Sequence, residues 1–379
     1  MVVAQFLRWI DTAKASERAA AAAALARAYL GNELEFEDRC AAEAALTFLL
    51  DDPSAKVRYA LAETLSLSPM SPPQVIAALA ADQPEVAGVV LARSPVLADA
   101  DLIERVACGD ERVQLAVASR PYVSMQVAAA LAEIGQPEAC CALLENHGAE
   151  IAALSYRRMA ERFGDDGALR HALLADPRLP SDSRHALLTK IGEALLGSPL
   201  VVASIGKARA GRITKEACVR ASITVIDGTG ANELGALVEH LRARGELTAG
   251  FIVRAVALGK IDFFGAVLVS LTGQGAERVR SLLTSGRDAA LSALFRAGGL
   301  PRAIDPAILT ALRVWREVAI GKRLAGAQEV SFLMLQAIDP SGQGGSSSET
   351  RELTALLKSI HLDELRANAR GHAMAIAAA

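Results

Sequence analysis

The sequence predicts an all-α protein in which a solenoid of stacked helical hairpins is followed by a second helical domain. Hydrophobic residues make up 52% of the 379 residues but aromatic residues only 4%, so the core must come from Ala, Leu, Val and Ile on closely packed helices. A turn followed by an apolar helix recurs along the first half. In the second half, the helical stretches are separated by glycine instead.

We assign residues 1–45 to an N-terminal helical cap that precedes the repeats. The chain starts with Met1, but charged side chains interrupt what would be the apolar region of a signal peptide. These are Arg8, Asp11, Lys14 and Glu17. We therefore expect no export signal.

The repeats occupy residues 46–195, and their clearest feature is an acidic turn that starts a helix. Copies begin at Asp52, Asp82 and Asp110, and a weaker fourth copy runs from Glu138 to Leu144. The period is about 26 to 30 residues. The segments between the copies supply the partner helix of each hairpin, over Val75–Ala81, Ala100–Ala107 and Met125–Ile134. Longer helices over Ile151–Arg162, Leu169–Leu174 and Ser183–Leu196 continue the array.

Each repeat unit has a simple physical design. The Asp, or the adjacent Pro, is expected to cap the second helix, while Val and Leu face the neighbouring unit. A single unit cannot bury its apolar face, so the units must stack. Arg58 next to Asp51 and Asp52 is interpreted as a bridge between neighbouring turns rather than as a recognition site.

The second helical domain is predicted over residues 196–340, where glycines punctuate the helices. Residues 341–348 are rich in Gly and Ser and predict a flexible linker. The tail at 349–379 is predicted to be a mobile amphipathic helix that needs a partner, in cis or in trans. Its apolar face carries Leu353, Leu356, Leu357, Ile360 and Leu365.

Charge is unevenly distributed along the chain. Residues 1–193 carry 18 Lys and Arg against 27 Asp and Glu, residues 194–323 carry 18 against 10, and the remainder 4 against 6. Five cations gather near the predicted domain junction, offset only by Glu216: Lys207, Arg209, Arg212, Lys215 and Arg220. They predict a site for an anionic ligand or partner. The alternative is a solvated basic segment whose charge complements that of the acidic first half, within the molecule or between copies in a homo-oligomer.

No catalytic residue, metal site or cofactor is predicted from the sequence. The histidines and cysteines lack metal-ligand spacing, and the adjacent Cys140 and Cys141 are interpreted as small helix residues, at least one of them buried. Thr272–Glu277 has the glycines of a phosphate loop but neither the strand nor the Lys. The most apolar stretch, Phe251–Leu271, is interrupted by charges, so we expect no membrane segment, no membrane partner and a cytoplasmic location.

Several segments resemble a bacterial domain-of-unknown-function family, number 2336, found mainly in alphaproteobacteria. The resemblance rests on Val57–Glu63, Leu91–Leu97, Asp101–Glu104 and Asn146–Ile151, and covers the chain from about residue 20 to about residue 320. The helix starts also look like HEAT repeats, which implies a HEAT-like α-solenoid that presents an extended surface to other macromolecules. The resemblance carries no catalytic signature and implies an interaction module in bacterial signalling.

Three functions remain open on the sequence. The favoured one is a non-catalytic scaffold or adaptor that binds a protein partner through the repeats or the tail. The second is nucleic-acid or anionic-ligand binding through the basic second half, although a pI near 6.1 and few aromatics argue against nucleic acid. The third and least favoured is an enzyme built on a helical-repeat scaffold.

Overall fold

The computed structural model describes residues 9–10, 12–31, 34–338 and 348–378. Over these residues the chain is helical, and the only β-type pairing is an isolated bridge between Val123 and Ala149. The all-α prediction is confirmed. The chain forms two compact units, Met1–Ser183 and Arg184–Ala379. The boundary thus falls inside the helix that starts at Ser181, earlier than the boundary predicted after residue 195.

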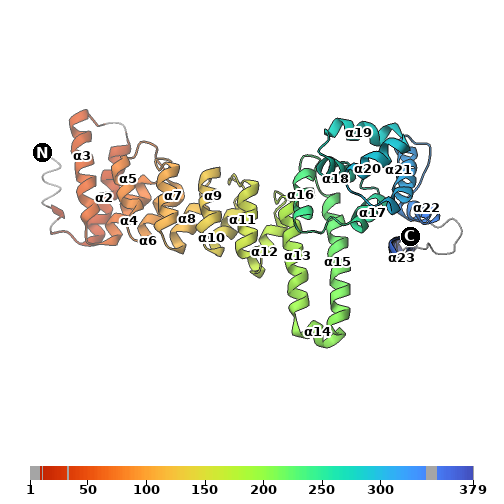
Figure 1. The fold of residues 1–379 in the computed structure, drawn as a ribbon. Helices are drawn as coiled ribbons and strands as arrows, with labels where there is room; N and C mark the ends of the chain where they lie inside the picture. Colours follow the sequence, from red (N-terminus) through yellow and green to blue (C-terminus); the bar gives the residue numbers. More distant parts are fainter. Residues whose placement is uncertain (1–8, 11, 32–33, 339–347, 379) are drawn as a thin grey trace. The chain divides into compact units, whose positions relative to one another are not determined.

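Unit 1 is built from two rows of helices that alternate along the chain (Figure 1). Its helices are α2 (Ala15–Leu30), α3 (Phe36–Phe48), α4 (Ala55–Leu65), α5 (Pro73–Ala80), α6 (Pro84–Arg93), α7 (Asp99–Cys108), α8 (Glu111–Ala118), α9 (Met125–Ile134), α10 (Pro137–Glu145), α11 (Ala153–Phe163) and α12 (Gly167–Ala175). The even-numbered helices α2 to α12 contact one another in series, and α7, α9 and α11 do the same in the other row. The N-terminal segment predicted as a cap contributes α2, which packs on α4.

The even-numbered helices repeat one burial pattern. From α4 to α12, each even-numbered helix buries one residue near its start and another four positions later, and in α6, α8 and α10 the residue after each of these is buried as well. The first buried residue of the series is Val57, Val86, Val113, Ala139 or Leu169. These positions lie 29, 27, 26 and 30 residues apart, which agrees with the period predicted from sequence. Residues four positions apart lie on one face of a helix, and adjacent residues are both buried where a helix packs against the next helix of its own row and against its hairpin partner.

The acidic residues of the turns do not all cap helices as predicted. The N-cap positions of α4 and α6 are Ser54 and Gln83, and Asp52 and Asp82 lie just before them. Asp110 does cap its helix, where its carboxylate accepts a hydrogen bond from the Val113 N–H at 3.1 Å, and Asp166 caps α12 in the same way through the Leu169 N–H at 2.8 Å.

Asp52 and Asp82 instead bind arginines from the preceding helix of the same row. Arg18 Nε donates to Asp52 Oδ2 at 2.7 Å, and Arg58 Nε donates to Asp82 Oδ2 at 2.5 Å. Arg58 also donates to the Asp52 main-chain carbonyl at 2.6 Å, so it bridges two turns. The interpretation of Arg58 as a bridge between neighbouring turns is confirmed.

Farther along the array, main-chain carbonyls replace the carboxylates as acceptors. Arg120, which is buried, donates to the carbonyls of Leu91 and Ser94, and Arg162 donates to that of Ala132 at 2.8 Å. These acceptors lie at helix ends, where carbonyl groups lack intrahelical partners. The long polar side chains of unit 1 therefore hold one repeat to the next.

Replacing Arg58 by Met is expected to destabilise unit 1 by about 1–3 kcal/mol, because it leaves the half-buried Asp82 carboxylate without its guanidinium. Hydrogen exchange of the α4 and α6 amides measures the effect. Lys56→Met, at an exposed position two residues away, is the matched control and should change stability by less than about 0.5 kcal/mol. Equal protection in wild type and Arg58→Met would show that the bridge contributes nothing.

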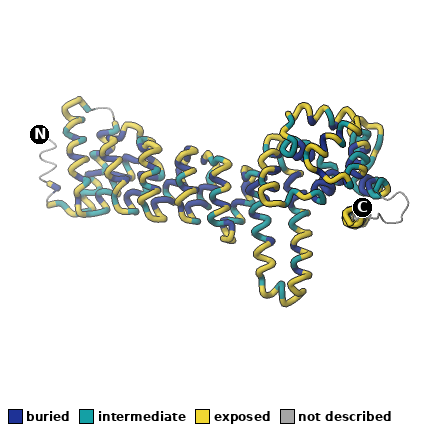
Figure 2. Tube along the Cα trace, viewed as in Figure 1, coloured by how far each residue is buried: buried dark blue, intermediate teal, exposed yellow. Residues whose placement is uncertain are grey.

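Unit 2 surrounds one hydrophobic core (Figure 2). Its helices are α13 (Ser181–Gly197, which begins in unit 1), α14 (Pro199–Ile205), α15 (Lys207–Asp227), α16 (Leu234–Ala243), α17 (Ala249–Ala257), α18 (Ile261–Thr272), α19 (Ala276–Ser285), α20 (Asp288–Ala297), α21 (Asp305–Ala319), α22 (Ala327–Ile338) and α23 (Ser348–Ala378). Helix α17 is central, because all residues from Phe251 to Ala257 are buried, including Arg254.

The tail helix α23 packs in cis. Leu353, Leu357 and Ile360 are buried in the core of unit 2, and Leu356 packs against its edge. Leu365 remains partly exposed. The sequence predicted that this face needs a partner but left open whether the partner is in cis or in trans. In the structure most of the face is covered by the same chain. The linker predicted at 341–348 lies outside the described residues, except for Ser348, which begins α23.

Helices α13, α14 and α15 form an antiparallel hairpin, with α14 at its end (Figure 1). Gly192 of α13 allows the close approach of α15, since a Cβ there would lie 2.6 Å from Cys218 Sγ. Within the described part of the chain, no single helix has both the length and the apolar character to cross a membrane. The pair α13 and α14, bent by 64°, meets that criterion by length and composition when taken together.

Candidate functional site

The five predicted basic residues all lie exposed on α15, but the structure does not bring them together into one cluster. Lys207 and Arg209 belong to the end of the hairpin, where α15 begins. Arg212 and Lys215 line one cavity of unit 2, and Arg220 lines another. The predicted patch therefore separates into three surroundings with different chemistry.

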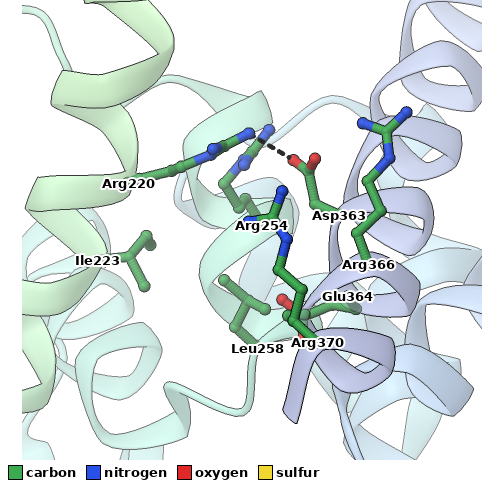
Figure 3. A pocket seen from close by; sticks show the side chains of 9 residues that line it. Arg220, Ile223, Arg254, Leu258, Asp363, Glu364, Arg366 and Arg370 are labelled. Carbon is green, nitrogen blue, oxygen red and sulfur yellow. Dashed lines mark hydrogen bonds and ion pairs between the residues drawn. The ribbon is translucent and has the colours of Figure 1, made fainter. Parts of the chain in front are cut away.

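The cavity at Arg220 is lined by arginines from three helices (Figure 3). Arg220 comes from α15, Arg254 from α17, and Arg366 and Arg370 from α23. The cavity has a volume of about 330 Å³. We call these four residues the arginine site.

Two carboxylates of α23, Asp363 and Glu364, share this cavity. Arg220 Nη2 lies 3.1 Å from Asp363 Oδ2, so one of the four guanidinium groups is paired (Figure 3). Four cations against two carboxylates leave an excess of two positive charges around the cavity. That excess favours an anionic occupant.

Arg254 is the least expected member of the site. Its side chain is carried by the core helix α17 and is only 9% exposed, yet among the described residues it makes neither a hydrogen bond nor an ion pair. Burial lowers the pKa of its guanidinium, while the nearby Asp363 acts in the opposite direction. Desolvating a guanidinium without a partner is costly, so the position of Arg254 at the cavity wall lowers the free energy of unfolding of unit 2.

A second cavity shares Arg254 and has a volume of about 540 Å³. Phe251, Val219 and Leu356 give it an apolar wall, and Arg212 and Lys215 line it together with two carboxylates, Glu216 and Glu246. Arg254 therefore stands between a cavity of mainly charged lining and one of mainly apolar lining. Guanidinium groups bind phosphate and carboxylate through paired N–H donors, so both groups fit here.

Sequence reasoning missed Arg254, Arg366 and Arg370. The available signal for Arg254 was an arginine inside the apolar run of Phe251–Ala257, a position where a soluble helix normally avoids charge. Arg366 and Arg370 are four residues apart and share a helix face. No pattern in the sequence showed that this face meets α17, because the contact depends on the docking of the tail.

The structure also contains a Ser, His and Glu arrangement that bears on the enzyme alternative. His185 Nε2 lies 2.8 Å from Ser222 Oγ and 3.3 Å from Glu246 Oε2, while its Nδ1 has no partner among the described residues. In a catalytic triad the acid binds the imidazole nitrogen opposite the serine. Here both groups meet one nitrogen, and the Ser222 hydroxyl donates to the Cys218 carbonyl of its own helix. The geometry therefore favours a structural role.

His185 predicts a pH dependence of stability. Burial lowers its pKa to about 4, although Glu246 raises it; the nearby His240 and Arg244 lower it further. The unfolded chain takes up this proton below pH 6.5, whereas the folded unit takes it up only near pH 4. The stability contributed by neutral His185 is therefore present above pH 6.5 and lost as the pH falls towards 4.

We expect His185 to account for a loss of about 2–3 kcal/mol in unit 2 between pH 7 and pH 4. Denaturant unfolding followed by Trp315 fluorescence in a Trp9→Phe background measures it, because Trp315 lies in unit 2. His185→Gln should show a flatter pH profile than the parent by that amount. Parallel profiles would show that His185 does not titrate differently in the folded and unfolded states.

The adjacent cysteines and the possible metal ligands do not form a reactive or metal-binding site among the described residues. Cys140 is buried, and burial raises the pKa of its thiol to about 12, so it is unreactive at neutral pH. Cys141 is half-buried. Among the described residues there is no group of three or more His, Cys, Asp or Glu side chains placed to hold a metal ion.

Unit 1 presents a second candidate surface, formed by equivalent positions on the even-numbered helices. The residue two positions after each leading buried residue faces outward; these residues are Tyr59, Gly88, Leu115, Cys141 and His171. We call this row the even-helix stripe. Tyr59 is 44% and Leu115 40% exposed, and a Cβ at Gly88 would meet no atom within 4 Å.

The stripe ends in a groove of about 680 Å³ between α10 and α12. Cys141 and His171 line this groove together with Leu144, Ala168 and Ala172. The exposed stripe and the groove thus form a continuous series of repeat-related positions on one row of helices, with apolar side chains open to an external surface.

Comparison with known proteins adds one finding. A family described as an uncharacterised protein conserved in bacteria (DUF2336) matches residues 86–344, which is more than half of the chain. No curated protein and no solved structure matches the sequence.

Proposed function

The chain belongs to this uncharacterised bacterial family, and we propose that it is a non-catalytic, HEAT-like scaffold or adaptor that binds a protein partner in the cytoplasm. The observation that carries the proposal is the even-helix stripe with its groove. Stacked repeats commonly use such extended faces for binding, because successive repeats place equivalent side chains at regular intervals.

The distribution of polar groups in unit 1 supports this surface. The arginines Arg18, Arg58, Arg120 and Arg162 are occupied by contacts between repeats, so they are not available to a ligand. The two large side chains on the stripe, Tyr59 and Leu115, are in contrast partly exposed to solvent. Buried Tyr side chains often supply much of the free energy of protein association and give rigid contact area at low entropic cost, and a Leu beside them adds apolar area to bury.

Substitution on the stripe tests the proposal. Full-length tagged protein is used to capture partners from a bacterial lysate, in parallel with Tyr59→Glu/Leu115→Glu. The double variant should lose a partner that wild type retains, with at least about tenfold less recovered, because two carboxylates are forced against an apolar partner surface.

The matched control is Met125→Glu/Ile134→Glu. Both residues are exposed apolar positions on α9, in the other row of helices, so the change in charge and hydrophobicity is the same. The control should capture the partner as wild type does. Identical capture by all three proteins would reject the stripe as the binding face.

A second candidate function is the binding of a small anionic ligand, and the specific observation in its favour is the buried, unpaired Arg254. It rests on unit 2 alone and is compatible with a scaffold whose second unit senses a phosphorylated or carboxylated molecule. Nucleic-acid binding has weaker support, because the predicted cations on α15 are divided among three surroundings. An enzyme has no support from the Ser222 and His185 geometry.

A further inference from the structure

The hairpin end of unit 2 combines two features that the scaffold proposal does not use. We define it as residues 194–213, which include the end of α13, all of α14 and the start of α15. Between Glu193 and Glu216 the chain contains no acidic residue, but it contains four cations. In the same stretch apolar residues are frequent.

Most of these apolar side chains are uncovered. Leu200 on α14 is 77% exposed, and Leu195, Leu196, Ile205 and Ile213 are also exposed. Figure 2 shows the hairpin end as mainly exposed, in contrast to the buried interior of unit 2. Of the residues 194–213, only Ala210 is buried. Five exposed Leu and Ile side chains within the hairpin end are unusual for a surface in contact only with water.

The sequence accounts for this exposure. Gly192 brings α13 and α15 together at Cys218 and Thr214, and beyond that contact the rest of unit 2 leaves most of residues 194–213 exposed. Gly206 has a φ of +77°, a conformation that suits glycine, and it turns the chain from α14 into α15. The apolar side chains are therefore carried to the end of the hairpin, where the rest of unit 2 does not cover them.

The accompanying charges limit what can cover this surface. Lys207 and Arg209 are exposed beside the apolar residues. A second copy of the hairpin end would bring the same cations together with no carboxylate between them, and like charges held in proximity oppose association. An anionic surface with an apolar interior satisfies both features at once.

We propose that the hairpin end docks on the surface of a lipid bilayer that contains anionic headgroups, with Leu200 and its apolar neighbours inserted at the level of the acyl chains. Interfacial segments combine Lys and Arg on one side with Leu on the other in this way. This revises the expectation that a membrane is not a partner.

The direction of α14 fits such a docking. Helices α13 and α14 are bent by 64°, so α14 lies across the hairpin axis rather than along it. In a hairpin that meets a surface end-on, α14 is closer to the plane of that surface than to its normal. The hairpin then inserts side chains without sending a helix through the bilayer.

Vesicle co-sedimentation of the full chain tests the proposal. Wild type should bind vesicles of phosphatidylcholine mixed with phosphatidylglycerol, bind phosphatidylcholine alone weakly, and bind less at high salt. Lys207→Gln/Arg209→Gln should weaken binding about 25-fold, at roughly fivefold for each cation. Leu200→Asp should weaken it by about tenfold or more, because the inserted side chain becomes charged.

Matched controls separate the hairpin end from general charge and hydrophobicity. Arg278→Gln/Arg280→Gln removes two exposed cations from α19, and Leu324→Asp changes a leucine that is 98% exposed elsewhere in unit 2. Both should bind vesicles as wild type does. Lys207 and Arg209 line neither the cavity of the arginine site nor the second cavity that shares Arg254, so the vesicle result is independent of small-anion binding.

Three results would overturn the proposal. The first is an absence of wild-type binding to phosphatidylglycerol vesicles at low salt. The second is equal binding by the hairpin and control variants. The third is light scattering that shows a wild-type dimer which Leu200→Asp dissociates, without any vesicle binding, because a second copy would then be the occupant. Circular dichroism of each variant, together with Trp315 fluorescence, verifies that it is folded.

Discussion

Leu357→Ala is expected to lower the unfolding free energy of unit 2 by about 2–5 kcal/mol. Leu357 is fully buried in the core although it lies in the predicted tail, so its truncation creates a cavity between α23 and the rest of the unit. Denaturant unfolding followed by Trp315 fluorescence in a Trp9→Phe background reports the change. Trp315 is a suitable probe because its Nε1 donates to the Val256 carbonyl of α17 at 2.8 Å.

Leu365→Ala on the same helix is the control. Leu365 is 37% exposed, and we expect its truncation to cost less than about 1 kcal/mol. If the two variants were equally stable, α23 would not be docked in solution, and the arginine site, which takes two of its four arginines from α23, would not assemble.

Arg254→Met is expected to stabilise unit 2 by about 1–3 kcal/mol and to remove anion binding. A Met side chain fills similar space without the cost of burying an unpaired guanidinium. Wild type should gain thermal stability as inorganic phosphate is added at constant ionic strength, because a ligand that binds only the folded state stabilises it. The variant should start from a higher melting temperature and show no such gain.

Arg242→Met, an exposed arginine on α16 outside both cavities, serves as the control and should keep the phosphate effect. A loss of stability in Arg254→Met would show that the guanidinium has a structural partner. An unchanged response to phosphate would place the anion elsewhere. Either result would remove the specific support for an anionic ligand at the arginine site.

The repeat architecture could be predicted because its causes are local. The copies at Asp52, Asp82 and Asp110 each start a helix that buries one residue and another four positions later, although the first buried residue lies five, four and three positions after the Asp, at Val57, Val86 and Val113. The role of the aspartates could not be assigned in the same way. A carboxylate before a helix suits both an N-cap and an arginine partner, and the choice for Asp82 depends on Arg58, which lies 24 residues earlier.

The tail and the arginine site depended on contacts between distant segments. Leu353 and Leu357 have the spacing of an apolar helix face whether that face meets unit 2 or another molecule, so the amphipathic pattern was predictable but its partner was not. Arg220 was included in the predicted basic patch because its neighbours in sequence are basic. Its neighbours in space are Arg254 and Arg370, which follow from the packing of α15, α17 and α23 (Figure 3).

The most direct test of the central claim, that the even-helix stripe is the partner-binding face, is photo-crosslinking in living bacteria. A photoreactive amino acid is placed at Leu115 in one strain and at Met125, on the other row of helices, in another. The account predicts one specific adduct from Leu115 that is absent from Met125. Adducts from Met125 alone, or the same adduct in equal amount from both positions, would contradict it.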